Sequence, residues 1–170
     1  MEIAKRYENY PLWIVILSNL NTLGIYALGI VIMLQAGGIV SLLYLVYVLL
    51  LEFRLIRYHC TSCYYFGKTC GFGQGRLSAL FFKKGDISKF CNKTMFWKDM
   101  IPDLLISLIP LITGIVLLIV KFNLLLLFAI LLVIALTTQG NAYIRGKLTC
   151  NYCKQRDLGC PANELFNKKK

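Results

Sequence analysis

The fold is decided by residues 12–51, LWIVILSNLNTLGIYALGIVIMLQAGGIVSLLYLVYVLLL, because this stretch contains no charged side chain. An α-helix rises about 1.5 Å per residue, and the hydrocarbon core of a bilayer is about 30 Å thick, so the stretch is long enough to cross a membrane twice. Gln35-Ala36-Gly37-Gly38 interrupts it with residues typical of a turn. The pattern therefore predicts a hairpin of transmembrane helices at 12–34 and 39–56.

Two further uncharged windows, residues 104–120 and 122–144, are each long enough to cross a bilayer once. They predict a second hairpin, with helices at 104–120 and 124–144. Across the 170 residues, 58% are hydrophobic and 16% are charged, against about a quarter charged in soluble proteins. This composition excludes disorder and most soluble folds. We predict an all-α integral membrane protein whose four transmembrane helices form two tandem hairpins, 12–56 and 104–144.

The basic residues predict the orientation of the chain in the membrane. With four spans, the N-terminus, residues 57–103 and residues 145–170 lie on one side, and this side, with Arg54 counted at its rim, holds every Lys and Arg except Lys121. Lys and Arg favour the cytoplasmic side, so we expect both termini in the cytoplasm and the protein in the cytoplasmic membrane. The net charge of +11 then lies beside an anionic inner leaflet, which attracts each basic residue by about 1 kcal/mol. Lipid accounts for this charge better than nucleic acid, and no nucleic-acid partner is expected.

The chain repeats a cysteine motif. Cys60, Cys63 and Cys70 have the spacing Cys-x2-Cys-x6-Cys, and the same spacing returns at Cys150, Cys153 and Cys160. One constant offset superposes both the motifs and the hairpins, which predicts two repeats. The first repeat, 1–103, contains hairpin 12–56, cysteine cluster 59–70 and a basic and aromatic interfacial segment, 71–103. The second repeat, 104–170, contains hairpin 104–144, cysteine cluster 150–160 and a basic tail. An axis along the membrane normal would bring the two clusters together.

Metal binding is the preferred interpretation of these cysteines. Cytoplasmic thiols stay reduced, which argues against structural disulfides, and paired Cys-x2-Cys steps build tetrathiolate Zn sites or hold iron–sulfur clusters. The expected cofactor is therefore Zn or an iron–sulfur cluster. A working dithiol and ordinary free thiols remain alternatives. The candidate ligands are Cys60, Cys63, Cys70, Cys91, Cys150, Cys153 and Cys160, with His59 as a weaker candidate because an interfacial imidazole explains it as well.

Two ligand pairings are open. In the first, Cys60, Cys63, Cys150 and Cys153 form one site that joins the repeats. In the second, Cys60, Cys63, Cys70 and Cys91 form one site, while Cys150, Cys153 and Cys160 take a fourth ligand from His59, Glu164 or solvent. We favour separate or adjacent centres, because the third cysteine of each motif would otherwise be unused.

Basic and aromatic residues near the cysteines predict contact with lipid. The candidate lipid-binding residues are Arg54, Arg57, Lys83, Lys84, Lys89, Lys93, Trp97 and Lys98. Arg54 and Arg57 could also neutralise a tetrathiolate centre. Glu52 is expected to pair with a nearby Arg, with ion or proton handling as the alternative. The glycines of Gly71-Phe72-Gly73-Gln74-Gly75 predict a turn that folds Cys70 back toward Cys60, in preference to a phosphate-binding loop.

The sequence contains no hydrolase triad, paired glycosidase carboxylates or kinase motif, so an enzyme is not the first expectation. The leading hypothesis is a membrane subunit that binds Zn or an iron–sulfur centre and serves assembly or electron transfer in a membrane protein complex or homo-oligomer. The first alternative is a thiol–disulfide oxidoreductase in which a Cys-x2-Cys pair reacts with a quinone; this chemistry needs a lowered thiol pKa. The second is a soft-metal transporter that receives Cu(I) or Zn on thiolates.

Overall fold

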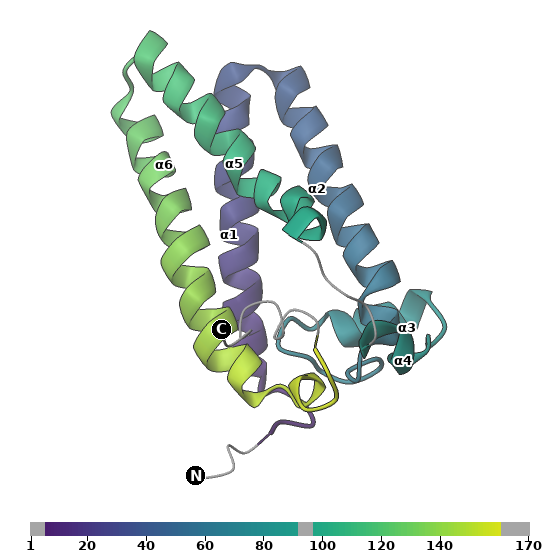
Figure 1. The fold of residues 1–170 in the computed structure, drawn as a ribbon. Helices are drawn as coiled ribbons and strands as arrows, with labels where there is room; N and C mark the ends of the chain where they lie inside the picture. Colours follow the sequence, from purple (N-terminus) through teal and green to yellow (C-terminus); the bar gives the residue numbers. More distant parts are fainter. Residues whose placement is uncertain (1–5, 92–96, 161–170) are drawn as a thin grey trace.

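Four long helices dominate the computed structural model, which describes residues 6–91 and 97–160 (Figure 1). They are α1 (Leu12–Ala36), α2 (Gly38–Tyr58), α5 (Trp97–Val120) and a last helix that begins as α6 (Leu124–Ala135). Each is long and apolar enough to cross a membrane, as the sequence predicted. The described residues form no strand, and a single bridge between Tyr7 and Cys153 is their one β-type pairing.

Tight turns separate the helices at the predicted positions. Gly37 lies between α1 and α2 with φ +141°, a conformation that side chains disfavour, and its N–H donates to the carbonyl oxygens of Met33 and Leu34 at 3.2 Å each. Between α5 and α6, the side chain of Asn123 caps the new helix by accepting from the N–H of Leu125 at 3.0 Å. Both turns are short, so the helices that they join run side by side.

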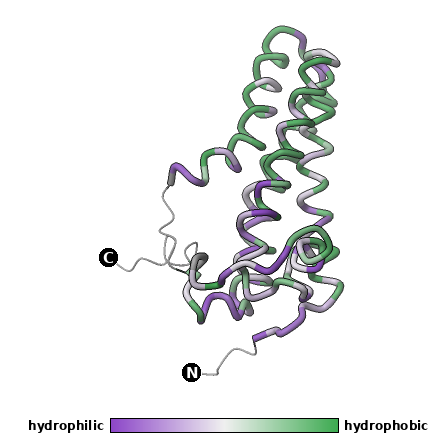
Figure 2. The backbone as a smooth tube through the Cα atoms, turned by 90° about the vertical axis from the view of Figure 1, so that its right-hand side faces the viewer, coloured by the Kyte–Doolittle hydropathy of each residue, from purple (hydrophilic) through white to green (hydrophobic). Residues whose placement is uncertain are grey.

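Helix α1 lies at the centre of the bundle and contacts α2, α5 and α6. Ile32 of α1 packs with Ala129, Ile130 and Val133 of α6 in one buried cluster. The outer faces are apolar as well: Ile39 and Ile119 are 79% and 81% exposed. Figure 2 shows hydrophobic residues throughout the part of the bundle away from the termini. Such a surface is expected where lipid covers it.

The fourth helix is longer and less regular than predicted. Instead of ending at residue 144, it continues through two segments with π-helical hydrogen bonding, η2 (Leu136–Gly140) and η3 (Ala142–Thr149). The Thr137 hydroxyl donates to the carbonyl oxygen of Val133 at 2.7 Å, and such hydroxyl bonds bend helices. π-Helical segments in α-helices often lie at functional sites.

Short elements gather at the end of the bundle that carries the N-terminus (Figure 1). They are η1 (Cys60–Ser62), α3 (Gln74–Phe81), α4 (Ile87–Cys91), η4 (Cys150–Tyr152) and η5 (Lys154–Arg156). We call residues 59–91 and 150–160 the cysteine platform. Of the predicted site residues, Lys93 and Glu164 lie outside the described residues, as do the side chains of Lys89 and Trp97 and the basic tail from residue 161 onward.

Candidate metal centre

The two Cys-x2-Cys motifs adopt the same backbone turn. In each, the last cysteine donates its N–H to the carbonyl oxygen of the first at 3.4 Å, Cys63 to Cys60 and Cys153 to Cys150. The preceding residues also match, with φ and ψ of −107° and −49° at His59 and −104° and −61° at Thr149. A second turn follows both motifs, with N–H to carbonyl distances of 3.1 and 3.2 Å. The repeat seen in the sequence therefore extends to local backbone geometry.

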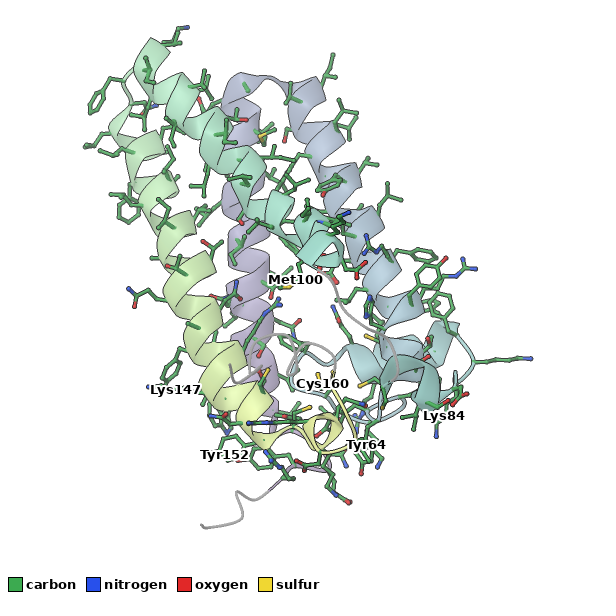
Figure 3. All side chains as sticks on the ribbon, viewed as in Figure 1. Tyr64, Lys84, Met100, Lys147, Tyr152 and Cys160 are labelled. Carbon is green, nitrogen blue, oxygen red and sulfur yellow. The ribbon has the colours of Figure 1, made fainter. Side chains whose placement is uncertain are left out.

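The structure brings thiols of both motifs together in the cysteine platform (Figure 3). Cys63, Cys70 and Cys153 all pack against a buried cluster of Tyr10, Ile14 and Tyr65. Cys63 is close enough to Cys70, Cys153 and Cys160 to interact with each electrostatically, and the same holds between Cys60 and Cys63 and between Cys150 and Cys160. The fold thus places Cys63 and Cys153, one from each motif, against the same buried residues.

Gln155, in the second cluster, forms hydrogen bonds with a residue of the first cluster and with Cys91. Its side chain is only 2% exposed; it accepts from the N–H of Tyr64 at 2.7 Å and donates to Cys91 Sγ at 3.4 Å. Cys91 therefore reaches the second cluster through Gln155. Within residues 6–91 and 97–160, no three Cys, His, Asp or Glu side chains converge closely enough to hold a metal ion. Neither of the two predicted ligand pairings is selected by this arrangement.

Burial raises the pKa of the Cys63 and Cys153 thiols, whereas hydrogen bonds with the backbone lower it. Burial raises the pKa of Cys63 to about 11, while a hydrogen bond involving the backbone of Tyr65 acts to lower it. Burial also raises the pKa of Cys153, and the backbone groups of Gln155 and Arg156 lower it in the same way. A redox-active dithiol needs a lowered thiol pKa, and burial acts in the opposite direction at both cysteines. The amide groups that favour a thiolate would serve a bound cation equally well.

The N-terminal segment, residues 6–10, ties the two clusters together, a role that sequence analysis missed. Tyr7 donates its N–H to the carbonyl oxygen of Tyr152 at 3.1 Å and accepts from the Tyr65 hydroxyl at 2.7 Å. That hydroxyl accepts from the N–H of Lys154 at 3.0 Å, and the Tyr10 hydroxyl donates to the carbonyl oxygen of Thr149 at 2.6 Å. The available signal was the gathering of tyrosines at the chain start and beside both cysteine pairs.

Two ion pairs add to this connection. The Arg6 guanidinium donates to both carboxylate oxygens of Asp157, at 2.9 and 3.0 Å. Lys154 pairs with Glu8, which lowers the pKa of the Glu8 carboxyl through the hydrogen bond from Lys154. Both pairs join the N-terminal segment to the second cluster, and their exposure limits their contribution to stability.

The glycine-rich segment after Cys70 forms a turn, as predicted. Gly73 has φ +75°, and a Cβ at Gly75 would collide with the backbone oxygen of Tyr65 and lie 2.6 Å from that of Lys68. The N–H of Gly75 donates to Cys70 Sγ at 3.4 Å, and the N–H of Gly73 to the carbonyl oxygen of Cys70 at 3.0 Å. These amides are used to hold Cys70 rather than to bind a phosphate.

Glu52 does not pair with an arginine, contrary to the prediction. Its carboxylate accepts from the Tyr26 hydroxyl at 2.5 Å and from the side-chain amide of Gln74 at 2.7 Å. The Gln74 carbonyl oxygen in turn accepts from the Cys60 thiol at 3.7 Å. A chain of hydrogen bonds therefore runs from the first cysteine of the platform into the helical bundle. The expected partner was wrong because Gln74 reaches Glu52 only through the folding back of the glycine-rich turn.

The described lipid-binding candidates lie in the platform, at the adjoining end of α2 or at the start of α5. The Arg57 guanidinium lies 5.6 Å from the centre of the Tyr58 ring, and Lys83 and Lys84 are exposed. Arg54 and His59 are half-buried. Beside them, α3 exposes apolar side chains, Leu80 at 78% and Phe81 at 72%. Exposed apolar and basic side chains occur together here, as in helices that lie in a membrane interface.

Comparison with models of known protein families, with curated proteins and with solved structures found no match to the chain.

Proposed function

We propose that this protein is a membrane subunit that holds a Zn ion or an iron–sulfur centre on the cysteines of its two clusters and serves assembly or electron transfer in a larger membrane complex. The observation that carries the proposal is the matched pair of Cys-x2-Cys turns, packed against one buried cluster through Cys63 and Cys153. A turn that presents two thiolates on one side is the local unit of thiolate metal sites. Binding would displace the thiol protons, so the raised thiol pKa makes metal affinity increase with pH.

The orientation belongs to the same proposal. The two hairpins form tandem repeats, and both cysteine clusters with both termini lie in the cytoplasm, where thiols stay reduced. The anionic inner leaflet then contacts the candidate lipid-binding residues, among them Arg57, Lys83 and Lys84. The exposed apolar face of α3 would enter the headgroup layer beside them. In this arrangement the platform lies against the membrane with its metal centre beneath the bundle.

Metal analysis of the full chain, purified without oxygen in detergent, tests the proposal. We expect at least one equivalent of Zn or Fe per chain; an iron–sulfur centre absorbs visible light, whereas Zn does not. The Cys63→Ser and Cys153→Ser variants distinguish the ligand pairings. In a joint site, either substitution alone removes all the metal, whereas with separate sites each removes only the metal of its own cluster.

Thr61→Ser, between Cys60 and Cys63, is the matched control, because a serine hydroxyl can still donate to the carbonyl oxygen of Arg57. This variant should keep the full metal content. Protein purified without oxygen that carries no stoichiometric Zn or Fe would refute the proposal. Loss of metal in the control but not in the cysteine variants would also refute the proposal.

A further inference from the structure

A cavity with polar and apolar lining opens between the long helices, and its lining residue Glu52 is linked through Gln74 to Cys60. The cavity has a volume of about 170 Å³ and is lined by residues of all four long helices. A single water occupies roughly 30 Å³ in the liquid, so the cavity is larger than one ion requires. Its charged lining residues are Glu52 of α2, Asp103 of α5 and Arg145 of η3. Glu52 belongs to a helix that is apolar enough to cross the membrane, and ionisable residues in such helices are costly and commonly functional.

The charged groups of this cavity do not form ion pairs with one another. Among the described residues, no ion pair connects Arg145 with Glu52 or Asp103, so their charged groups lie more than 4.0 Å apart across the cavity. Glu52 is held in place by Tyr26 and Gln74. The Arg145 guanidinium rests over the Phe72 ring at 5.1 Å, a contact that leaves its N–H donors free for an anion. The cavity therefore offers separate anionic and cationic partners to one ligand.

The uncharged lining residues also offer separate hydrogen-bond acceptors and donors. The hydroxyls of Thr22, Ser107 and Thr137 donate to carbonyl oxygens of their own helices at 3.0, 3.1 and 2.7 Å. Their protons are used, so only their lone pairs remain for a ligand that donates N–H. The Asn141 carbonyl oxygen accepts from Asn21 at 3.2 Å, which leaves the Asn141 amide protons as donors near Arg145. The site thus combines many acceptors for an ammonium group with a few donors for an anion.

We infer that this cavity binds a zwitterion with a primary ammonium and a phosphate, the chemistry of phosphoethanolamine. Arg145 and Asn141 would hold the phosphate, and Asp103 with the hydroxyls would accept from the ammonium. Leu51, Leu55 and Ile106 add apolar lining, which suits a headgroup attached to a lipid. The ligand can come from membrane phosphatidylethanolamine or from soluble phosphoethanolamine, and the inference does not rest on the proposed metal.

Titration of delipidated full-length protein in detergent tests this inference. The ligands are short-chain phosphatidylethanolamine, phosphatidylcholine and phosphatidylglycerol, and soluble phosphoethanolamine, and binding is measured by calorimetry. We expect the ethanolamine lipid to bind at least tenfold more tightly than the other two lipids, because choline lacks N–H donors and glycerol lacks the cation. Binding of the lipid identifies the membrane as the source; binding of phosphoethanolamine alone identifies a soluble source. Equal binding of all three lipids, or binding of no ligand, overturns the inference.

Variants of the charged lining residues test whether the ethanolamine ligand binds in this cavity. Arg145→Gln and Asp103→Asn should each weaken the ethanolamine ligand about tenfold or more, as expected when one charge-assisted hydrogen bond is removed. Lys147→Gln and Asp99→Asn are matched controls on the same two helices, since neither residue lines the cavity, and their affinity should change less than about twofold. Equal losses in variants and controls would overturn the inference. The ligand comparison in the unmodified protein does not depend on how the variants fold.

Discussion

Gly75→Ala is the sharpest test of how the platform holds Cys70. Replacing glycine by alanine within a helix normally stabilises a protein by about 1 kcal/mol. At Gly75, in α3, the added Cβ would meet the backbone oxygens of Tyr65 and Lys68, which cannot rotate away as a side chain can. Overpacking of this kind costs about 1–3 kcal/mol, so the sign of the usual effect should reverse. The variant should unfold more easily than the natural protein.

Gly146→Ala is the matched control, because Gly146 is also helical and a Cβ there would meet nothing within 4 Å. For a chain of this size, 1 kcal/mol shifts the thermal midpoint by about 2–4 °C. Thermal unfolding in detergent should therefore show a midpoint several degrees lower for Gly75→Ala and an unchanged or higher midpoint for Gly146→Ala. The Gly75 variant should also lose metal, since its N–H donates to Cys70 Sγ. A Gly75→Ala midpoint equal to that of the control would refute the steric argument.

Four other predictions test the platform and the topology. Tyr65→Phe removes one donated and one accepted hydrogen bond and should lower the unfolding free energy by about 1–3 kcal/mol in denaturant titrations, whereas Tyr58→Phe, at a 64% exposed position, should change little. In metal-free protein, burial raises the pKa of Cys63 from about 9 to about 11, so its alkylation at pH 7, followed by mass spectrometry, should be about a hundredfold slower than that of an exposed cysteine. The same shift should make the folded state lose stability as the pH rises from about 9 through 11, because the unfolded chain releases this proton first; a stability that stays constant over this range would contradict it. In intact cells, Phe122→Cys should react with a membrane-impermeant maleimide, while the natural protein should not; labelling of the natural protein would invert the proposed orientation.

Hydropathy along the chain was sufficient to find the four long helices. The breaks at Gly37 and Asn123 specify the turns inside the two hairpins, because turn signals act over a few neighbouring residues, whereas α5 begins at Trp97 instead of 104 and the fourth helix continues past 144. The identical spacing around Cys60 and Cys150 is accompanied by matching backbone turns. Local interactions can be predicted from a sequence because the partners are close along the chain.

Only the tertiary structure decided which distant groups meet. Tyr7 contacts Tyr65 and Tyr152, and Gln155 contacts Tyr64, although nothing in the spacing of these residues indicates the pairing. Glu52 meets Gln74 because a glycine-rich turn doubles back, and this replaced the arginine expected from proximity in sequence. The cavity needs side chains from all four long helices at once. Such contacts depend on how the helices pack and rotate against one another, which charge and hydropathy along one chain leave open.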